Sequence, residues 1–311
     1  MRQCDKGKHR RTPPKMKRLI MKIFTLTCLS LISATAMADS IDQRLDAAPD
    51  GVVTISNISG SVEVTGWSRN EVEVSGDLGS GVKELIFERD DNEIEITVKA
   101  PGRGDHNISS DLVIHVPEMS AVKVTGVSVD IDIRNVLGVL NLQSVSGDID
   151  SEVHAADIEI VTVSGDIEVQ GDDKMAHAEL SAVSGDIEIQ NLAGEVSVDS
   201  VSGDLVLVNS SLERVRMETV NGDIVFDAAL TEDGTFSVET INGDLDINFS
   251  NSVSARFDIE TFNGDIRNCF GPDPVRSSDY GPGTELKFSE GDGKGRVTIK
   301  TLNGDLRLCK D

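Results

Sequence analysis

Residues 183–205 read VSGDIEIQNLAGEVSVDSVSGDL, and the repeat inside this stretch predicts the architecture of most of the chain. The tripeptide Ser-Gly-Asp recurs after 18 residues, and the interval divides into two units of nine that begin at Gly185 and Gly194. When the first residue of a unit is counted as position 0, apolar residues occupy positions 2, 4 and 7. Such alternation is typical of β-strands with one buried face and excludes an amphipathic helix.

The same repeat extends over the C-terminal part of the chain. Its Ser/Asn-Gly-Asp tripeptide has the glycine at Gly147, Gly165, Gly185, Gly203, Gly222, Gly243, Gly264 and Gly304. Units of nine residues begin at 120, 129, 138, 147, 156, 165, 176, 185, 194, 203, 213, 222, 234, 243, 255, 264, 295 and 304. Two units make one rung, and stacking of rungs at about 4.8 Å is needed to bury their apolar residues. The sequence therefore predicts an all-β, parallel β-solenoid of about nine rungs over residues 120–311, with an insertion at about 270–294.

The two units of a rung differ in how much their lengths vary. Units that precede the Ser/Asn-Gly-Asp corner are always nine residues long, whereas their partners vary from 9 to 31 residues. All insertions are therefore expected at one edge of the solenoid, the variable edge. The opposite edge, the constant edge, carries the corners. We expect the corners to be rigid and partners to contact the variable edge, where loops can change without disturbing the stack.

Residues 39–119 are also strand-like, but we expect them to lie outside the nine-residue repeat. Short alternating segments at 62–64, 72–74, 94–96 and 112–114 are separated by turn-rich sequence. These residues are predicted to form an N-terminal β cap that covers the open end of the stack, where unpaired strand edges would promote aggregation.

The first 38 residues resemble a secretory signal peptide. A basic segment precedes apolar residues 23–32, and Ala-Met-Ala at 36–38 supplies the small side chains that a signal peptidase requires. The first fifteen residues fit neither a leader nor a domain, so a start at Met16 or Met21 is an alternative. The sequence predicts export to the periplasm or cell surface, with no transmembrane segment after leader removal.

The charge of the chain limits its partners. It has 29 basic and 54 acidic residues, and the leader holds nine of the basic ones and one acidic one, so the exported part has a net charge near −33. This charge disfavours nucleic acid and anionic lipid, because binding to either depends on cationic contacts. Cations, basic peptides and neutral or cationic glycans remain open as partners.

A column of aspartates, one from each corner, is the most suggestive chemical feature: Asp148, Asp166, Asp186, Asp204, Asp223, Asp244, Asp265 and Asp305. Stacked carboxylates repel one another unless they accept hydrogen bonds from turn amides or bind cations. Calcium-binding β-rolls use several glycines in each turn, whereas these corners have one, so we predict a structural ladder, no metal and no cofactor. A second column, expected to bond from rung to rung, precedes the glycines: Ser146, Ser164, Ser184, Ser202, Asn221, Asn242, Asn263 and Asn303.

Three sets of residues resemble a known bacterial family. They are Gly51-Val52-Val53 through Gly66-Trp67 to Glu71-Val72, the repeated Val-Ser/Asn-Gly-Asp-Ile, and Tyr280-Gly281-Pro282-Gly283 ahead of a closing Asn303-Gly304-Asp305. The pattern covers nearly all of the chain after the leader and resembles the domain-of-unknown-function family labelled "putative adhesin". The resemblance implies a secreted or envelope-associated β-solenoid, and the family has no defined catalytic residues to carry over.

No group of residues in the sequence resembles an active site. His106, His115, His154 and His177 lack the spacing of a metal site, and no serine lies in a nucleophile elbow. Glycan cleavage needs carboxylates in unlike environments, whereas the corner aspartates are equivalent. We therefore favour a non-enzymatic exported envelope or surface protein that acts as an adhesin or scaffold on a component of unknown identity. A polysaccharide-degrading β-helix enzyme and a binding module for cations or basic peptides are the alternatives.

Cys269 and Cys309 are the only cysteines left after leader removal, and we predict that they form a disulfide in an oxidising compartment. Each lies five residues after a corner glycine, so both have the same position in the repeat. If their rungs are direct neighbours, their Cα atoms lie about 4.8 Å apart, within the range that a disulfide accepts. Residues 284–288 alternate like a strand, and an extra rung there would separate the cysteines by nearly ~10 Å. Three prolines in the insertion argue against that rung.

Overall fold

The computed structural model describes residues 39–101, 107–154, 157–278 and 281–310. Their regular secondary structure consists of β-strands, and none of them belongs to a helix that could cross a membrane. The leader predicted over residues 1–38, its alternative starts and His106 lie outside the described residues. The described residues belong to one compact unit, residues 37–311.

Two columns of strands face each other across a shared interior, and each rung contributes one strand segment to each column. In order along the stack, the first column contains β4 (Glu84–Asp90), β5 (Glu93–Lys99), the first part of β2 (Val52–Trp67), the first part of β7 (Ala121–Arg134), β8 (Leu140–Ser146), β10 (Asp157–Ser164), β12 (Met175–Ser184), β14 (Ala193–Ser202), the last parts of β15 (Leu205–Asn221) and β16 (Ile224–Asn242), β22 (Gly295–Asn303), β18 (Ala255–Asn263), β21 (Thr284–Ser289) and β20 (Val275–Arg276).

The second column is built from the other segment of each rung. It contains β1 (Asp39–Asp46), β3 (Glu71–Leu78), β6 (Ser110–Pro117), the last parts of β2 and β7, β9 (Ile149–Val153), β11 (Ile167–Gly171), β13 (Ile187–Gln190), the first parts of β15 and β16, β17 (Leu245–Phe249), β23 (Leu306–Lys310) and β19 (Ile266–Asn268). From β2 to β18 and from β6 to β19, neighbouring strands pair in parallel, as the predicted β-solenoid requires.

The stack continues into the region predicted to be a cap. Strand β2 pairs with β7 through both columns, with Val53 opposite Val122 and Val62 opposite Ile131. The expectation that residues 39–119 lack the nine-residue repeat is therefore wrong for residues 51–68, where units begin at Gly51 and at Gly60. Beyond β2, strands β5 and β6 add a further parallel rung, and β1, β3 and β4 pair in antiparallel fashion. Residue 119 stays a predicted domain boundary.

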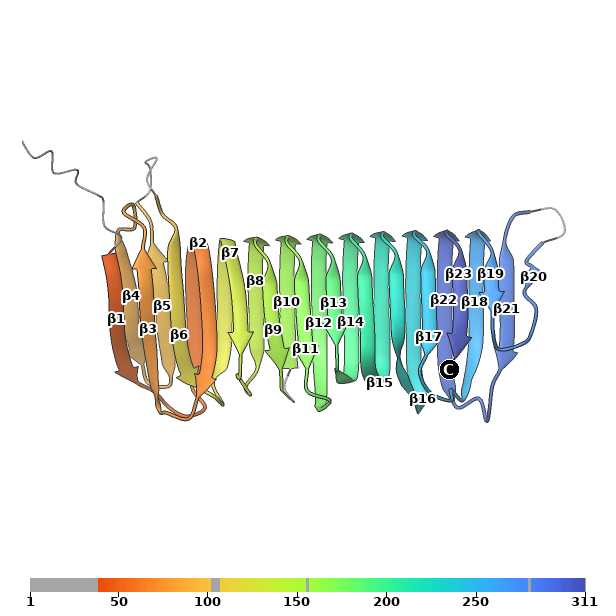
Figure 1. Cartoon of the computed structure of the whole chain (residues 1–311), viewed down its shortest axis with the longest axis horizontal. Helices are drawn as coiled ribbons and strands as arrows, with labels where there is room; N and C mark the ends of the chain where they lie inside the picture. The colour runs from red at the N-terminus through yellow and green to blue at the C-terminus, as the bar shows by residue number, and fades with distance from the viewer. Residues whose placement is uncertain (1–38, 102–106, 155–156, 279–280, 311) are drawn as a thin grey trace, which may run out of the picture. The chain divides into compact units, whose positions relative to one another are not determined.

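Neighbours in the stack differ from neighbours in the sequence at the C-terminal end. Strand β22 pairs with β16 on one side and β18 on the other, while β23 lies between β17 and β19 (Figure 1). The last rung of the chain is thus inserted between the two rungs that precede it. Residues 284–289 add no rung between the cysteines, because β21 pairs in antiparallel fashion with β18 on the far side from β22.

The interior is filled by the side chains at positions 2 and 4 of each unit, as predicted. Ile187 and Ile189, for example, are each 1% exposed. Towards the C-terminal end the filling becomes aromatic: the rings of Phe226, Phe236 and Phe249 meet edge to face with centroids 4.7 to 5.5 Å apart. Such pairs add to the stability gained from burial alone.

Candidate binding surface

The constant edge is built on a backbone geometry that only glycine adopts readily. At Gly203 φ is 136°, and a Cβ atom there would lie 2.0 Å from the carbonyl oxygen of Gly185 in the neighbouring rung. The glycine is therefore required both by the left-handed backbone and by the close approach of adjacent corners. This geometry fixes the direction in which the flanking side chains leave the corner.

The corner aspartates form a continuous hydrogen-bonded ladder. From Asp130 to Asp305 in spatial order, the carboxylate Oδ1 of each aspartate accepts a hydrogen bond from the backbone N–H of the aspartate in the next rung, at 2.7 to 3.1 Å. In spatial order the members are Asp130, Asp148, Asp166, Asp186, Asp204, Asp223, Asp244, Asp305 and Asp265. The acceptors thus serve amides of the next rung rather than amides of their own turn. Among the described residues, no three His, Cys, Asp or Glu side chains are arranged to hold a metal ion.

The second predicted column lies next to this ladder. Its asparagines bond side chain to side chain: Asn242 donates to Asn221 at 2.9 Å, and Asn303 donates to Asn242 and Asn263 to Asn303 at 2.8 Å. Its serines, Ser146, Ser164, Ser184 and Ser202, stand in register with one another and with Asn221. Both columns are structural parts of the constant edge.

The apolar residue at position 7 of the first column is exposed, contrary to the expectation of a single buried apolar face. Strand alternation directs positions 2, 4 and 6 inward, and position 6 holds buried Ser, Thr or Ala residues such as Thr162 and Ala182. Position 7 therefore points to solvent, and its residues are 36% to 50% exposed. In spatial order this apolar column consists of Val127, Val145, Val163, Val183, Val201, Val220, Ile241, Leu302 and Phe262.

A groove of about 610 Å³ lies over the C-terminal part of the apolar column. Val220, Ile241, Leu302 and Phe262 line it, and the insertion supplies a wall through Ser277, Gly283 and Thr284. Because the last rung is inserted between its predecessors, Leu302 lies between Ile241 and Phe262 and joins their apolar surface. We call this depression the C-terminal groove.

Carboxylates line the side of the C-terminal groove that lies away from the corner. Position 5 of the same strands carries Asp199, Glu218, Glu239, Lys300 and Glu260, in spatial order. Farther towards the N-terminal end, the same column is uncharged: Thr125, Gln143, Val161 and Ser181. The acidic side is thus confined to the C-terminal groove.

Basic side chains partly neutralise this acidic row. Arg216 contacts Asp199 at 2.8 Å and Glu218 at 2.6 Å, and Lys300 contacts Glu239 at 3.2 Å. Lys287 contacts Glu260 at 3.2 Å as well as Glu285 and Asp258. Exposed ion pairs of this kind contribute little to stability and exchange readily for other partners.

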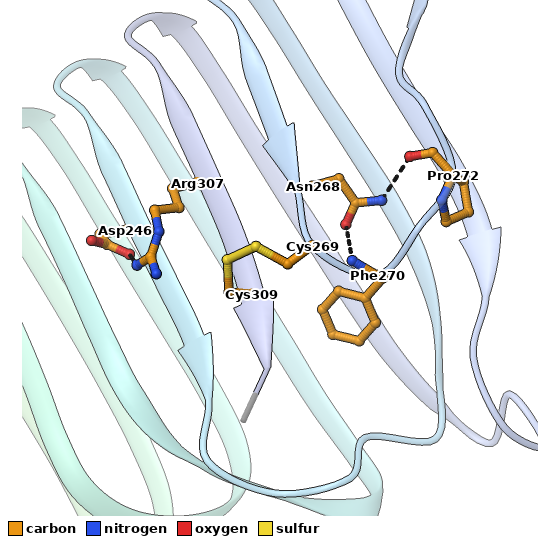
Figure 2. Close-up of a disulfide and its surroundings, with 7 residues drawn as sticks. All are labelled: Asp246, Asn268, Cys269, Phe270, Pro272, Arg307 and Cys309. Carbon is orange, nitrogen blue, oxygen red and sulfur yellow. Dashed lines mark hydrogen bonds and ion pairs between the residues drawn. A yellow bond between two sulfur atoms is a disulfide. The ribbon is translucent and has the colours of Figure 1, made fainter.

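The predicted disulfide is present at the variable edge of the last two rungs. Cys269 and Cys309 are bonded, with their Cα atoms 4.8 Å apart (Figure 2). Their rungs are direct neighbours because β19 pairs with β23, and the backbone N–H of Cys269 donates to the carbonyl oxygen of Leu308. A disulfide is typical of proteins exported to an oxidising compartment.

Each described histidine has different partners. His115 stacks on the single tryptophan with ring centroids 4.9 Å apart, and His177 contacts glutamates of its own and the next strand. His154 Nδ1 lies 3.0 Å from Asp172, and hydrogen bonds from Lys174 and His154 lower the pKa of Asp172 to about 2. None of these contacts joins one described histidine to another.

The strand stack and its repeated corners define a parallel β-solenoid with one constant and one variable edge. Residues 52–308 match the model of the Toastrack DUF4097 family, and the chain belongs to that family. A comparison with curated proteins finds no match.

Several solved structures are similar to this chain at low sequence identity. A putative adhesin from Bacteroides fragilis is 12% identical, with 87% of this chain and 97% of that chain covered and a TM-score of 0.46. A putative adhesin from Parabacteroides distasonis is 11% identical, with 87% and 98% covered and a TM-score of 0.37. A putative lipid binding protein from the same species is 11% identical, with 87% and 97% covered and a TM-score of 0.36.

Proposed function

We propose that this protein is a non-enzymatic binding protein of the bacterial envelope or cell surface, acting as an adhesin or scaffold. The observation that carries the proposal is the apolar column. Nine apolar side chains, each 36% to 50% exposed, follow one another on adjacent rungs. Contiguous exposed apolar surface of this kind marks interaction sites in soluble proteins.

Export is part of the same proposal. The leader-like first 38 residues and the strong negative charge support it, and so does the disulfide at the end of the stack. The corner carboxylates are used by backbone amides of neighbouring rungs, which supports a structural role for them rather than acid–base chemistry.

Co-sedimentation with envelope fractions tests this function. Purified protein is mixed separately with membrane vesicles and with peptidoglycan, and we expect saturable binding to at least one of them. The triple variant Val163→Ser, Val183→Ser, Val201→Ser should bind at least tenfold more weakly. Val225→Ser is the matched control, because Val225 is 38% exposed but lies outside the apolar column.

Two results would count against the proposal. The first is equal binding of the triple variant and the control to every fraction. The second is release of new reducing ends when purified protein is incubated with acidic polysaccharides, which would instead identify a glycan-cleaving enzyme.

A further inference from the structure

The C-terminal groove differs from the rest of the apolar column in both size and charge. Its apolar side chains include Ile241, Leu302 and Phe262, whereas the earlier members of the column are all valines. Four carboxylates and one lysine line its side, whereas the uncharged side chains of Thr125 and Gln143 occupy the same position on earlier rungs. One part of a uniform repeat has therefore been specialised.

The chemistry of the C-terminal groove selects a ligand with both apolar and cationic groups. Leu302 and Phe262 are 45% and 50% exposed, so contact with an apolar side chain would remove a large apolar area from water. The row from Asp199 to Glu260 and its ion-pair partners have an excess of negative charge, because six carboxylates share the three cations Arg216, Lys287 and Lys300. Cationic groups of a ligand could replace Arg216 and Lys300 as partners of these carboxylates.

Charge argues against a second copy of this chain as the occupant. The apolar column lies between the acidic row and the corner with its aspartate ladder, so two copies joined through this face would bring carboxylates together on both sides. The chain as a whole has a net charge of −25, which adds long-range repulsion.

Length argues for a peptide rather than a small molecule. A volume of about 610 Å³ would suit either, but the apolar surface does not end where the C-terminal groove ends. It continues over Val201, Val183 and the rungs beyond at a similar exposure. An extended chain can follow such a surface across several rungs.

We propose that the C-terminal groove binds a basic amphipathic peptide segment of a partner protein. The apolar side chains of the segment lie on Ile241, Leu302 and Phe262, and its lysine or arginine side chains pair with Glu218 and Glu239. This inference rests on the proposed function only in treating the protein as a binding protein. It adds a location and a partner chemistry, and it places this contact on the outer face of the first column, beside the constant edge, with part of the insertion as a wall.

Fluorescence anisotropy with designed peptides tests the proposal on the purified full chain. The probe is a labelled twelve-residue peptide of alternating leucine and lysine, and the comparison peptides alternate leucine with glutamate or serine with lysine. We expect the Leu-Lys peptide to bind at least tenfold more tightly than either comparison peptide. Added salt should weaken its binding, because part of the attraction is electrostatic.

Matched variants locate the site. The double variant Phe262→Ser, Leu302→Ser should weaken Leu-Lys binding at least tenfold, whereas Val127→Ser, Val145→Ser changes the same repeat position beside uncharged neighbours and should weaken it less than twofold. Glu218→Gln, Glu239→Gln should reduce both affinity and salt dependence. Its control, Glu159→Gln, Glu179→Gln, removes the same charge outside the C-terminal groove. Thermal unfolding establishes that each variant is folded.

Three outcomes would overturn the proposal. Equal effects of the two serine variants would mean that the peptide binds without using the C-terminal groove. Equal binding of the Ser-Lys and Leu-Lys peptides would reduce the interaction to charge alone. A wild-type dimer in sedimentation equilibrium that Phe262→Ser, Leu302→Ser dissociates would identify a second copy as the occupant. If envelope binding persists while the Leu-Lys peptide fails to bind, only the groove proposal is lost.

Discussion

At each corner three consecutive backbone N–H groups need hydrogen-bond acceptors. The corners of the two neighbouring rungs provide these acceptors. Gly185 donates to the carbonyl oxygen of Ser202, and Ile187 donates to that of Asp204, both in the following rung. The amide between them, on Asp186, points the other way and donates to the carboxylate of Asp166. The aspartate therefore satisfies the one corner amide that the backbone ladder does not, which explains why glycine and aspartate recur together.

Replacing a corner glycine should be costly. Gly203→Ala puts a side chain on a residue with φ of 136° and places its Cβ 2.0 Å from the carbonyl oxygen of Gly185. Backbone strain alone costs about 1–3 kcal/mol, and the steric clash adds to it. Urea unfolding should show the loss. Gly281→Ala is the control, because its Cβ would meet Ser278 at an ordinary 3.6 Å. Equal stability of the two variants would contradict the role given to Gly203.

The aspartate ladder should tolerate loss of charge but not loss of the acceptor. Asp204→Ala leaves the N–H of Asp223 without its 2.8 Å acceptor, which should cost about 1 kcal/mol. Asp204→Asn keeps an acceptor oxygen and removes one of several stacked negative charges, so its free energy of unfolding should equal or exceed that of wild type. Chemical denaturation at neutral pH compares the two variants. A less stable asparagine variant would show that the charge itself is needed.

Asp150 should make stability depend on pH in the opposite sense to most carboxylates. Partial burial raises its pKa, Asp148 and Asp130 raise it further, and Arg134 opposes them. A pKa above the unfolded value means that ionisation disfavours the folded state, so this contribution to stability is present at acid pH and is lost as pH rises through the folded pKa. Asp150→Asn should therefore raise the melting temperature at pH 7 but not at pH 3. Asp42→Asn, on β1, controls for the change in net charge.

At the scale of strands, both ends of the stack contain a rung inserted out of chain order. Strand β2 lies between β7 and the later strands β5 and β6, and the rung of β22 and β23 lies between two earlier rungs. Strands β18 and β19 can reach their final neighbours only when the chain end has entered the gap beside them. Strand pairs between segments that are far apart in the sequence form late in folding, because the entropy cost of closing the long loop must first be offset.

The disulfide should stabilise this inserted rung. The double variant Cys269→Ser, Cys309→Ser opens a loop of 40 residues. In the chain-entropy model this change lowers the free energy of unfolding by about 4 kcal/mol. We expect a lower melting temperature for the variant, with its strand content retained because β23 still pairs with β17 and β19.

Reductant supplies the control for the disulfide. It should lower the melting temperature of wild type towards that of the double variant and leave the variant unchanged. Two free thiols in unfolded, unreduced wild-type protein would contradict the bond itself.

The repeat in the sequence predicted the strands but not their full arrangement. Positions 2 and 4 were correctly predicted to be buried, and the disulfide followed from the shared repeat position of Cys269 and Cys309. The order of the last rungs could not be predicted, because Asn263 and Asn303 open nearly identical corners and either could pair with Asn242. The exposure of position 7 could have been predicted, since strand alternation continues from positions 2 and 4 to position 6.

For the whole molecule, stacking turns each repeat position into a column of like residues. The apolar column and the asparagine column gain from this arrangement, because like side chains contact or bond across rungs. Stacking does not stabilise acidic columns in this way, because rungs about 4.8 Å apart bring like charges close together. With 54 acidic against 29 basic residues, the fold carries an electrostatic cost that hydrogen bonds to backbone amides reduce without removing the charge.

Ionic strength should therefore stabilise the protein, and calcium should have no special effect. Raising sodium chloride from 20 to 500 mM shortens the Debye length to below the spacing of adjacent rungs, so repulsion within the acidic columns weakens and the melting temperature should rise. Adding 1 mM calcium chloride in 150 mM sodium chloride should leave it unchanged, because each ladder carboxylate from Asp130 to Asp305 already accepts an amide hydrogen bond. A large stabilisation that saturates at micromolar calcium would mean that the ladder binds the ion in addition to those amides.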